Sequence, residues 1–409
     1  MLYRKIENNG DELSVLGFGA MRLPSKNGRI DEKRATEQIR YAIDHGVNYI
    51  DTAAAYMNEP LVGRALSEGY RERVKIATKL PPWSVDKPGD LENIFKVQLE
   101  NFMTDHIDYY MLHALNRTNW EKMLELNALE FLDEIKGDGR IINAGFSFHG
   151  DKDTFKEIVD AYDWDFCLLQ FNYLDEENQA GLEGLKYAAD NGLAIIVMEP
   201  FRGGNLTRNV PPEVEEILNK AEVKRTPAEW ALRWVLNHPE VTCVLSGMNE
   251  EEHIKENIRI ADEALPNSLT EDELELIGQV RDKYRDLMKT GCTGCRYCMP
   301  CPMGVDIARC FEMYDTAQMF VQNKRQTQLL YTVALGVIHG GKPAYASNCI
   351  KCGKCEKHCP QELPIMELLD DVSDDMEGIL TKVVPPLYKT YLRFERFRTG
   401  RKARTMDEN

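Results

Sequence analysis

The sequence predicts an α/β protein in which a (β/α)8 TIM barrel is followed by a small α-helical, ferredoxin-like iron-sulfur domain. The chain has 409 residues, apolar runs alternate with helical patterns from about residue 30 to residue 265, and eight of the eleven cysteines cluster near the C-terminus. A barrel of about 250 residues with a small appendage accounts for this length. We therefore expect the barrel over residues 1–285, the iron-sulfur domain over 286–370 and a basic tail over 371–409.

Seven short runs are the expected strands of a parallel sheet, because they are apolar and are separated by helical stretches. They cover residues 48–51, 74–78, 107–112, 141–146, 166–170, 194–198 and 241–245. The helical stretches include residues 34–44 and 227–236, and the second opens with Thr226 as N-cap. Since a barrel needs eight strands, one strand is too short to be recognised, and we expect it in the weakly patterned segment 206–225.

The N-terminus predicts a β-hairpin, because residues 2–6 and 13–16 flank the turn sequence Asn8-Asn9-Gly10. We expect this hairpin to close the N-terminal end of the barrel. A doubly wound sheet is the alternative fold. It is disfavoured because residues 52–56, directly after the first strand, contain none of the glycines of a dinucleotide-binding turn.

Composition limits the partners and the location. A formal net charge of -17 repels nucleic acid phosphates, and no run approaches the roughly 18 apolar residues of a membrane span. The first residues lack the apolar segment of a secretory signal, so we expect a cytoplasmic protein with reduced thiols. The tail from Lys389 to Arg404 is rich in arginine and is either a docking surface for an acidic redox partner or anionic surface, or a solvated terminal helix.

Two cysteine runs predict two 4Fe-4S clusters. The second run has the spacing C-x-x-C-x-x-C-x-x-x-C-P, which is typical of bacterial ferredoxins, and the first differs by one residue in its last gap. In this pattern the fourth thiolate crosses to the other cluster. One cluster would take Cys292, Cys295, Cys298 and Cys359, and the other would take Cys349, Cys352, Cys355 and Cys301.

Zinc and disulfides are the alternatives for these cysteines. Zinc suits four thiolates equally well, and disulfides suit small secreted domains, but three successive short gaps exceed what a zinc ribbon needs. A helical stretch between the runs indicates the α-helical type of two-cluster domain. Cys167 and Cys243 lie in apolar strand-like runs and are expected to be buried packing residues, whereas Cys310 has no assigned use.

Polar residues lie where three of the predicted strands end. Asp51 ends the first strand and Tyr56 lies in the loop after it, Lys79 ends the second strand, and His113 follows the third. Active sites of TIM barrels form at the C-terminal ends of the strands. We therefore expect these four side chains to form one proton-transfer unit.

Residues 50–56, 77–79 and 110–113, together with Glu59, resemble motifs of the aldo/keto reductase family, and the likeness extends over about residues 1–285. The resemblance implies that Tyr56 is the general acid for a carbonyl oxygen, that Lys79 and Asp51 tune it, and that His113 orients the substrate. Because an adjacent ammonium favours a phenolate, we expect Lys79 to bring the pKa of Tyr56 down from its ordinary value near 10.

The resemblance also implies a nicotinamide cofactor, NAD or NADP. It assigns carboxamide contacts to Ser147 and Gln170, the pyrophosphate loop to Gly203 and Gly204, and the adenosine-phosphate end to Ser246 and Asn257.

Two positions depart from the family pattern. Phe148 stands where the family usually has asparagine, and Gly247 stands where a basic residue commonly meets the 2'-phosphate. Glutamates at 250, 251 and 252 would also repel that phosphate. We therefore expect no strong preference for NADP over NAD, and a hundredfold preference for NADP would contradict this expectation.

A reductase-like barrel joined to a two-cluster module resembles a prokaryotic group of ferredoxin-linked members of this family. The expected reaction is reduction of a small carbonyl compound, or oxidation of the alcohol, with clusters that exchange electrons with a protein partner. Hydride transfer moves two electrons and a cubane normally one, so either an additional flavin splits the pair or the clusters stay outside turnover. The alternative function is an electron-transfer or redox-sensing protein whose barrel is a binding scaffold, which the departures at Phe148 and Gly247 favour.

Overall fold

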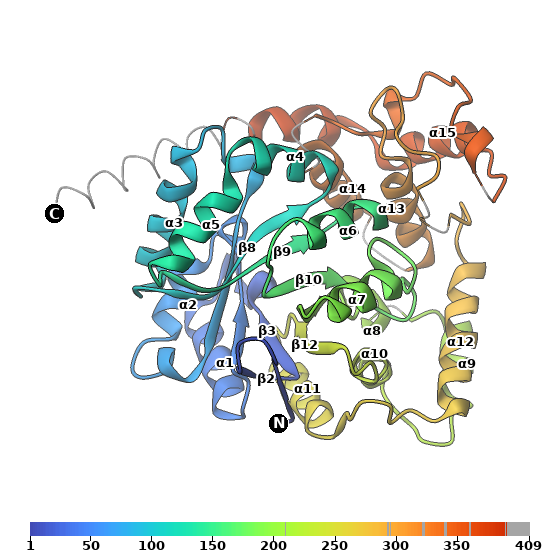
Figure 1. Ribbon diagram of the computed structural model, residues 1–409. Coiled ribbons are helices and arrows are strands. Elements are labelled where there is room, and N and C mark those ends of the chain that lie inside the picture. The colour runs from blue at the N-terminus through green and yellow to red at the C-terminus, as the bar shows by residue number, and fades with distance from the viewer. Residues whose placement is uncertain are drawn as a thin grey trace.

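The computed structural model describes residues 1–208, 210–292, 294, 296–320, 324–338, 342–359, 361–388 and 390. Cys295 and the arginines of the basic tail, 393 to 404, lie outside these residues. The barrel strands are β3 (Leu16–Gly19), β6 (Tyr49–Asp51), β7 (Lys75–Leu80), β8 (Ile107–Leu115), β9 (Ile141–Phe148), β10 (Phe166–Gln170), β11 (Ala194–Met198) and β12 (Val241–Ser246). They form a closed parallel barrel in the order β10-β11-β12-β3-β6-β7-β8-β9 (Figure 1), which confirms the predicted fold class.

Helices cover the outside of the barrel because each strand is followed by an amphipathic segment that buries one apolar face. They are α1 (Glu32–Asp44), α2 (Glu59–Ala65), α3 (Gly89–Phe102), α4 (Arg117–Glu125), α5 (Ala128–Gly137), α6 (Lys152–Asp160), α7 (Gly181–Asp190), α8 (Asn205–Arg208), α9 (Pro212–Leu218), α10 (Pro227–Leu236), α11 (Glu251–Glu263) and α12 (Glu271–Asp286). The Thr226 side chain accepts a hydrogen bond from the backbone N–H of Glu229, so the predicted start of α10 is correct.

The eighth strand is β3, and the prediction that it lies within residues 206–225 was wrong. The described part of that segment forms α8 and α9. Two glycines, Gly17 and Gly19, weaken the strand pattern of β3 in the sequence. Gly17 is needed by the packing, because an added Cβ atom would lie 2.7 Å from Leu245 Cδ2 in the barrel interior.

The predicted N-terminal hairpin is present as β1 (Tyr3–Lys5) and β2 (Glu12–Ser14), paired antiparallel. Ile6 and Leu13 belong to the cluster of buried side chains that fills the barrel interior. The hairpin therefore plugs the N-terminal end of the barrel, as expected. A second short ribbon consists of β4 (Ser25–Lys26) and β5 (Arg29–Ile30).

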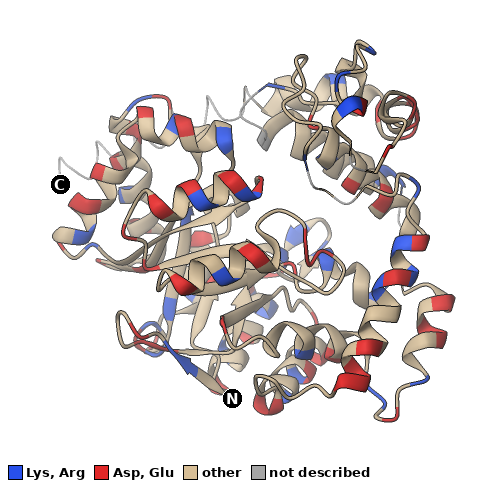
Figure 2. Ribbon diagram, turned by 45° about the vertical axis from the view of Figure 1, so that its right-hand side comes forward, with Lys and Arg blue, Asp and Glu red and all other residues tan. Residues whose placement is uncertain are grey.

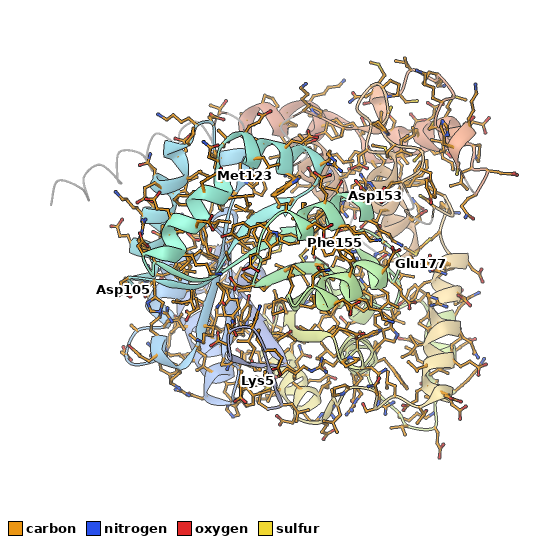
Figure 3. All side chains as sticks on the ribbon, in the orientation of Figure 1. Lys5, Asp105, Met123, Asp153, Phe155 and Glu177 are labelled. Carbon is orange, nitrogen blue, oxygen red and sulfur yellow. The ribbon has the colours of Figure 1, made fainter. Side chains whose placement is uncertain are left out.

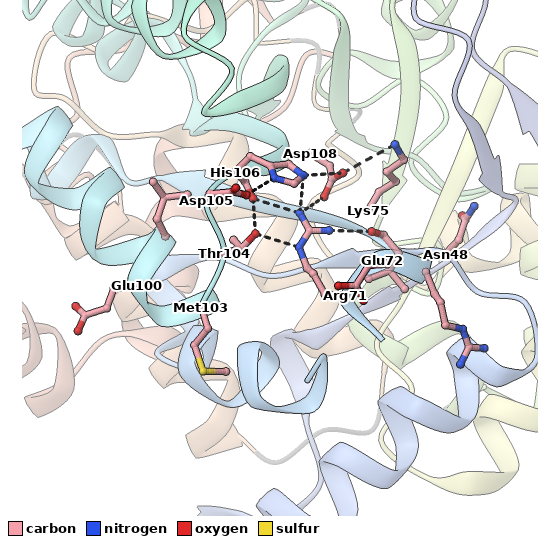
Figure 4. Close-up of a pocket in the computed structure, with 13 residues that line it drawn as sticks. Asn48, Arg71, Glu72, Lys75, Glu100, Met103, Thr104, Asp105, His106 and Asp108 are labelled. Carbon is pink, nitrogen blue, oxygen red and sulfur yellow. Dashed lines mark hydrogen bonds and ion pairs between the residues drawn. The ribbon is translucent and has the colours of Figure 1, made fainter. Parts of the chain in front are cut away.

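The same end of the barrel carries a network of ion pairs around a surface hollow (Figure 4). Arg71 and Lys75 contact the carboxylate of Asp108 at 2.8 and 3.9 Å, and Lys75 also contacts Asp11 at 2.9 Å. These residues lie at the N-terminal ends of the strands, far along the barrel from Lys79. Since barrel active sites form at the opposite end, we assign this hollow to stability.

The C-terminal module has a hydrophobic core of its own, formed by residues such as Val305, Phe311 and Leu369. Its helices are α13 (Ile307–Met319), α14 (Lys324–Val333) and α15 (Ile365–Met376). Two of them lie between the cysteine runs, which confirms the predicted helical insert. The module lies beside loops that follow the barrel strands (Figure 1). Just before the module, Arg281 of α12 forms an ion pair of 2.7 Å with Glu176 of the β10–α7 loop.

Basic and acidic residues are interspersed along the outer helices in the ribbon of Figure 2. Within the described residues, no helix combines the length and the apolar character that crossing a membrane requires.

Candidate functional site

A buried ion pair lies at the C-terminal ends of two adjacent strands. β6 and β7 pair in parallel, with Asp51 opposite Ala77, which brings the side chains of Asp51 and Lys79 together. Lys79 Nζ lies 2.7 Å from both carboxylate oxygens of Asp51 and donates a third hydrogen bond of 2.7 Å to the Thr52 carbonyl oxygen. Burial alone would lower the pKa of Lys79, but attraction to Asp51 and Tyr56 outweighs it, so the pKa lies above its ordinary value.

Tyr56 is held beside this pair by a short 3-10 turn, Ala54–Tyr56, that follows β6. The centroid of its ring lies 5.2 Å from Lys79 Nζ, so the ammonium acts electrostatically on the phenol. Burial raises the pKa of Tyr56 more than Lys79 lowers it, so the pKa lies above 10. The expected lowering was therefore wrong in direction, because desolvation of the phenol exceeds the attraction of the ammonium. The phenol is protonated at neutral pH, as a proton donor must be.

His113 completes the group, but it lies within β8 and does not follow it. The strand pairing shifts between Leu112 and Leu115, and Ala114 has a φ of 49°, so an irregularity in the strand sets the direction of this side chain. The ring centroid of His113 is 6.2 Å from that of Tyr56 and 5.0 Å from that of Trp83. Burial, with repulsion from Lys79, holds the pKa of His113 well below its ordinary value, so the imidazole is neutral.

Glu59, whose position drew attention in the sequence, buttresses β7 from behind. Its Oε1 atom accepts hydrogen bonds of 2.7 Å from both Thr78 and Gln98. Gln98 also donates to the carbonyl oxygen of Lys79 at 3.1 Å. These buried contacts fix the backbone that carries Lys79, and they give Glu59 a positioning role.

One cleft joins Asp51 and Tyr56 to four of the six predicted cofactor residues. Gly203, Gly204, Ser246 and Asn257 line it, and Asn257 Nδ2 donates a hydrogen bond of 2.8 Å to Ser246 Oγ. The structure thus brings together residues from the loop after β11, the end of β12 and α11.

Two arginines that the sequence reasoning missed line the same cleft and face its two glycines. Gly203 and Gly204 have φ values of 70° and 95°. A Cβ atom added to Gly203 would lie 3.5 Å from Arg22 Nη2, and one added to Gly204 would lie 3.7 Å from Arg208 Nε. A bare backbone beside two guanidinium groups fits the pyrophosphate of a dinucleotide. The one available signal in the sequence was that Arg22 follows β3 closely. This signal was missed because the sequence pattern does not reveal the short strand β3.

The acidic residues near the adenosine end are partly neutralised. Arg34 of α1 contacts Glu250 at 2.6 Å and also pairs with Glu251. Arg22 lies beside Gly247 through its Cβ atom, which would be 3.8 Å from an added Cβ atom at Gly247. The repulsion that we expected from these glutamates is therefore smaller than the sequence implied.

Ser147 and Gln170 are not among the residues that line this cleft. Ser147 Oγ accepts a hydrogen bond of 2.7 Å from the backbone N–H of Ala114. Gln170 donates to Asp175 at 3.1 Å and accepts from Gln179 at 2.8 Å, so both ends of its amide are engaged within the protein.

Phe148, at the position of the usual asparagine, is fully buried on the helix side of β9. Its ring centroid lies 5.0 Å from that of Phe155, which projects from α6 (Figure 3). A phenyl ring there belongs to the layer between strand and helix, and it contributes no polar contact to the cleft.

The described cysteine sulfurs of the C-terminal module do not gather into a compact group. No disulfide joins two of the ten described cysteines. Among the described residues, no three cysteine sulfurs lie within 4.8 Å of one another, whereas tetrahedral zinc with bonds of about 2.3 Å needs separations of roughly 3.8 Å. The first cysteine of each run accepts a backbone N–H at 3.4 Å, Cys292 from Gly294 and Cys349 from Lys351. Such bonds to sulfur are typical of iron-sulfur ligands.

The surroundings of these cysteines are apolar. Six of the eight, at positions 292, 298, 301, 349, 355 and 359, pack against the core of the C-terminal module, and Cys352 is exposed. The eighth, Cys295, lies outside the described residues, so the crossed ligation stays a prediction. Cys167, Cys243 and Cys310 are buried, as expected for the first two.

Two family models match this chain. The aldo/keto reductase family matches residues 15–280, and a 4Fe-4S dicluster domain matches residues 291–363. The first match covers the barrel and the second covers both cysteine runs.

Characterised and solved relatives cover the barrel portion at low identity. The NADH-specific methylglyoxal reductase of Escherichia coli is 26% identical in an alignment 300 residues long that covers 60% of this chain and 89% of that protein. Glyoxal reductase of Bacillus subtilis is 28% identical over 262 residues, 62% of this chain and 86% of that protein. The holo form of an aldo-keto reductase from Bacillus halodurans superposes with a TM-score of 0.58 at 26% identity, covering 68% of this chain and 96% of that one.

Proposed function

Because this chain belongs to the aldo/keto reductase family, we propose that it reduces a small carbonyl compound, or oxidises the alcohol, with a nicotinamide cofactor. Tyr56 is the proton donor in this proposal. The observation that carries it is the buried Lys79 ammonium, which is fixed by three hydrogen bonds of 2.7 Å and lies 5.2 Å from the centroid of the Tyr56 ring.

The proton chemistry follows from these contacts. When Tyr56 gives its proton to the carbonyl oxygen, the phenolate that forms lies beside a cation that is already charged and held in place. Asp51 keeps Lys79 oriented from its other side. His113 is neutral, so it can hydrogen-bond to the substrate oxygen without competing as an acid.

The nicotinamide, when bound, supplies the hydride. Gly203 and Gly204 allow close approach of the pyrophosphate to the backbone, Arg22 and Arg208 balance its charge, and Ser246 and Asn257 contact the adenosine end. NAD and NADP both remain within this proposal. Neither family match indicates a flavin.

Two 4Fe-4S clusters complete the proposal, held by the two cysteine runs. The 4Fe-4S dicluster match and the apolar packing of the cysteines support them. In this proposal the clusters exchange electrons with a protein partner in the cytoplasm, where thiols stay reduced until iron binds. Iron and sulfide analysis after anaerobic purification tests this part on its own.

Tyr56→Phe tests the proton donor. We expect NADH-dependent reduction of methylglyoxal, used here because a relative is named for it, to lose at least 100-fold in kcat, since general acid catalysis contributes about 10²–10⁴-fold. Tyr162→Phe is the matched control, because its hydroxyl bonds only to Asp133 on the outer surface, and it should keep full activity. Undiminished turnover by Tyr56→Phe would show that the assignment is wrong.

A second function, a redox sensor with a non-catalytic barrel, is favoured by one observation. Both ends of the Gln170 amide are occupied by Asp175 and Gln179, which leaves this residue poorly placed to bind a carboxamide. A wild-type protein that holds clusters but neither binds nor turns over a nicotinamide would support the sensor.

A further inference from the structure

Arg202 occupies an unusual place in the loop after β11. Its side chain is only 7% exposed and its backbone φ is 48°, in the left-handed region. Its Nε atom lies 3.4 Å from Asp175 Oδ2, while its Nη1 atom is buried and has no hydrogen-bond partner among the described residues. A buried donor without a partner costs roughly 1–3 kcal/mol, and more when the group is charged. The orphaned guanidinium N–H therefore points to a missing acceptor.

The side chain of Arg202 does not face the cofactor cleft. Gly203 and Gly204, its immediate neighbours, line the cleft with Tyr56, but Arg202 is not among the lining residues. It lines instead a small cavity of about 110 Å³ between the barrel and the C-terminal module, together with Cys292 and Asp315. The carboxylates of Glu312 and Asp315 also line this cavity, but neither accepts a hydrogen bond from Nη1, so among the groups that the module brings to this cavity the Cys292 sulfur is the remaining acceptor.

Cys292 is fixed in the wall of the same cavity. Asp315 of α13 accepts hydrogen bonds of 2.8 Å from the backbone N–H groups of Lys289 and Thr290. Thr290 Oγ1 in turn accepts a bond of 3.1 Å from the N–H of Cys292. The first cysteine of the first run is thereby tied to α13 of the C-terminal module.

The barrel also packs against the residues just after Cys292. A Cβ atom added to Gly294 would lie 2.8 Å from Asn178 Oδ1, so the β10–α7 loop leaves no room for a side chain at this position. Glu177 of this loop lines the same cavity and lies on the side of the loop toward α12 (Figure 3). The first cysteine run is therefore the one that contacts the barrel here.

Asp175 connects Arg202 to the strand end that was assigned to the nicotinamide. Its Oδ2 atom accepts from Gln170 and Asn172 at 3.1 Å each, in addition to the contact with Arg202. A continuous set of buried polar contacts thus extends from the end of β10 to the cavity that contains Cys292.

We propose that Arg202 donates a hydrogen bond through Nη1 to a sulfur of the first cluster, and that it sets the reduction potential of that cluster. Hydrogen bonds to sulfur and nearby charge are the protein's main means of adjusting this potential. A guanidinium favours the reduced state, which carries one more negative charge. Arg202 acts here as a positioning residue, and this inference depends on the proposed clusters.

The test is a redox titration of both clusters in the intact holoprotein, followed by electron paramagnetic resonance. Arg202→Gln should lower the midpoint potential of one cluster, so that its reduced-to-oxidised ratio at the wild-type midpoint falls about tenfold, which is about 59 mV for one electron. Arg202→Lys keeps the positive charge but loses the planar guanidinium group. The midpoint potential of this cluster in Arg202→Lys should therefore lie between those in the wild type and in Arg202→Gln. Arg285→Gln is the matched control, since Arg285 lines the same cavity but is exposed, and it should change the ratio less than twofold.

Equal potentials in Arg202→Gln and wild type, or an equal shift in Arg285→Gln, would overturn the inference. If Arg202→Gln fails to retain iron, the test rests on Arg202→Lys. A midpoint potential in Arg202→Lys equal to that of the wild type would then overturn the inference. Absence of clusters from the wild type would instead refute the proposed function, and iron and sulfide analysis separates the two failures.

Discussion

The ion pair between Lys79 and Asp51 allows a quantitative prediction about stability. The two side chains are 2% and 6% exposed, and each depends on the other for its charge balance. Lys79→Met removes the ammonium and leaves a buried carboxylate that has lost two hydrogen bonds of 2.7 Å. Breaking one side of a buried pair costs about 3–5 kcal/mol, so we expect a loss of that size in the free energy of unfolding at pH 8.

The double variant Asp51→Asn/Lys79→Met isolates the pairing. It removes both charges at once, so its loss should fall below the sum of the two single losses by at least about 2 kcal/mol. The loss in Lys79→Met should also shrink at pH 5. Without the ammonium, burial raises the pKa of Asp51 above its unfolded value, and a group with a raised pKa is more favourable at low pH.

Urea titrations followed by tryptophan fluorescence measure this free energy for the barrel, because all five tryptophans lie between residues 83 and 234. Lys75→Met is the matched control. Lys75 is on the same strand but is 32% exposed and pairs with Asp11, so its loss should stay below about 1 kcal/mol. Additive losses in the cycle, or a Lys79→Met loss that does not change between pH 8 and pH 5, would refute this reasoning.

Two further predictions concern packing and pH. Gly63→Ala should destabilise the barrel by about 1–3 kcal/mol or more in urea titrations, because the new Cβ atom would lie 2.3 Å from the carbonyl oxygen of Asn101. Gly278→Ala, within the open helix α12, should instead stabilise by about 0.5–1 kcal/mol, and equal signs would contradict the packing argument. Burial lowers the pKa of His149 from 6.5 to about 4. The neutral imidazole therefore contributes fully to the free energy of unfolding above pH 6.5, and this contribution is lost as the pH falls through 4. Between pH 7 and pH 4 the free energy of unfolding of the wild type should fall by about 1–3 kcal/mol more than that of His149→Asn, after allowance for the partial exposure of the ring. Parallel plots of this free energy against pH for the two proteins would contradict the argument.

The sequence by itself predicted the features that depend on local pattern. Apolar runs at strand spacing located seven strands, Thr226 located a helix start, and the cysteine spacing located the module that the 4Fe-4S family model matches. It also placed Asp51 and Lys79 at strand ends, where parallel pairing brings them within 2.7 Å. Such features follow from the periodicity of strands and helices and from ligand chemistry, which neighbouring residues encode.

Only the tertiary structure decided the features that depend on contacts between distant segments. The strand β3 closes the barrel by pairing with β12 and β6, and the packing around Gly17 leaves no room for a side chain there, which no local pattern reveals. Burial reversed the expected direction for the pKa of Tyr56, since desolvation depends on all the chain that surrounds the phenol. Arg202 likewise lines a different cavity from its glycine neighbours, one that it shares with Cys292, 90 positions further along the chain. Strand and ligand positions are properties of short segments, whereas desolvation and side-chain direction depend on how the whole chain packs.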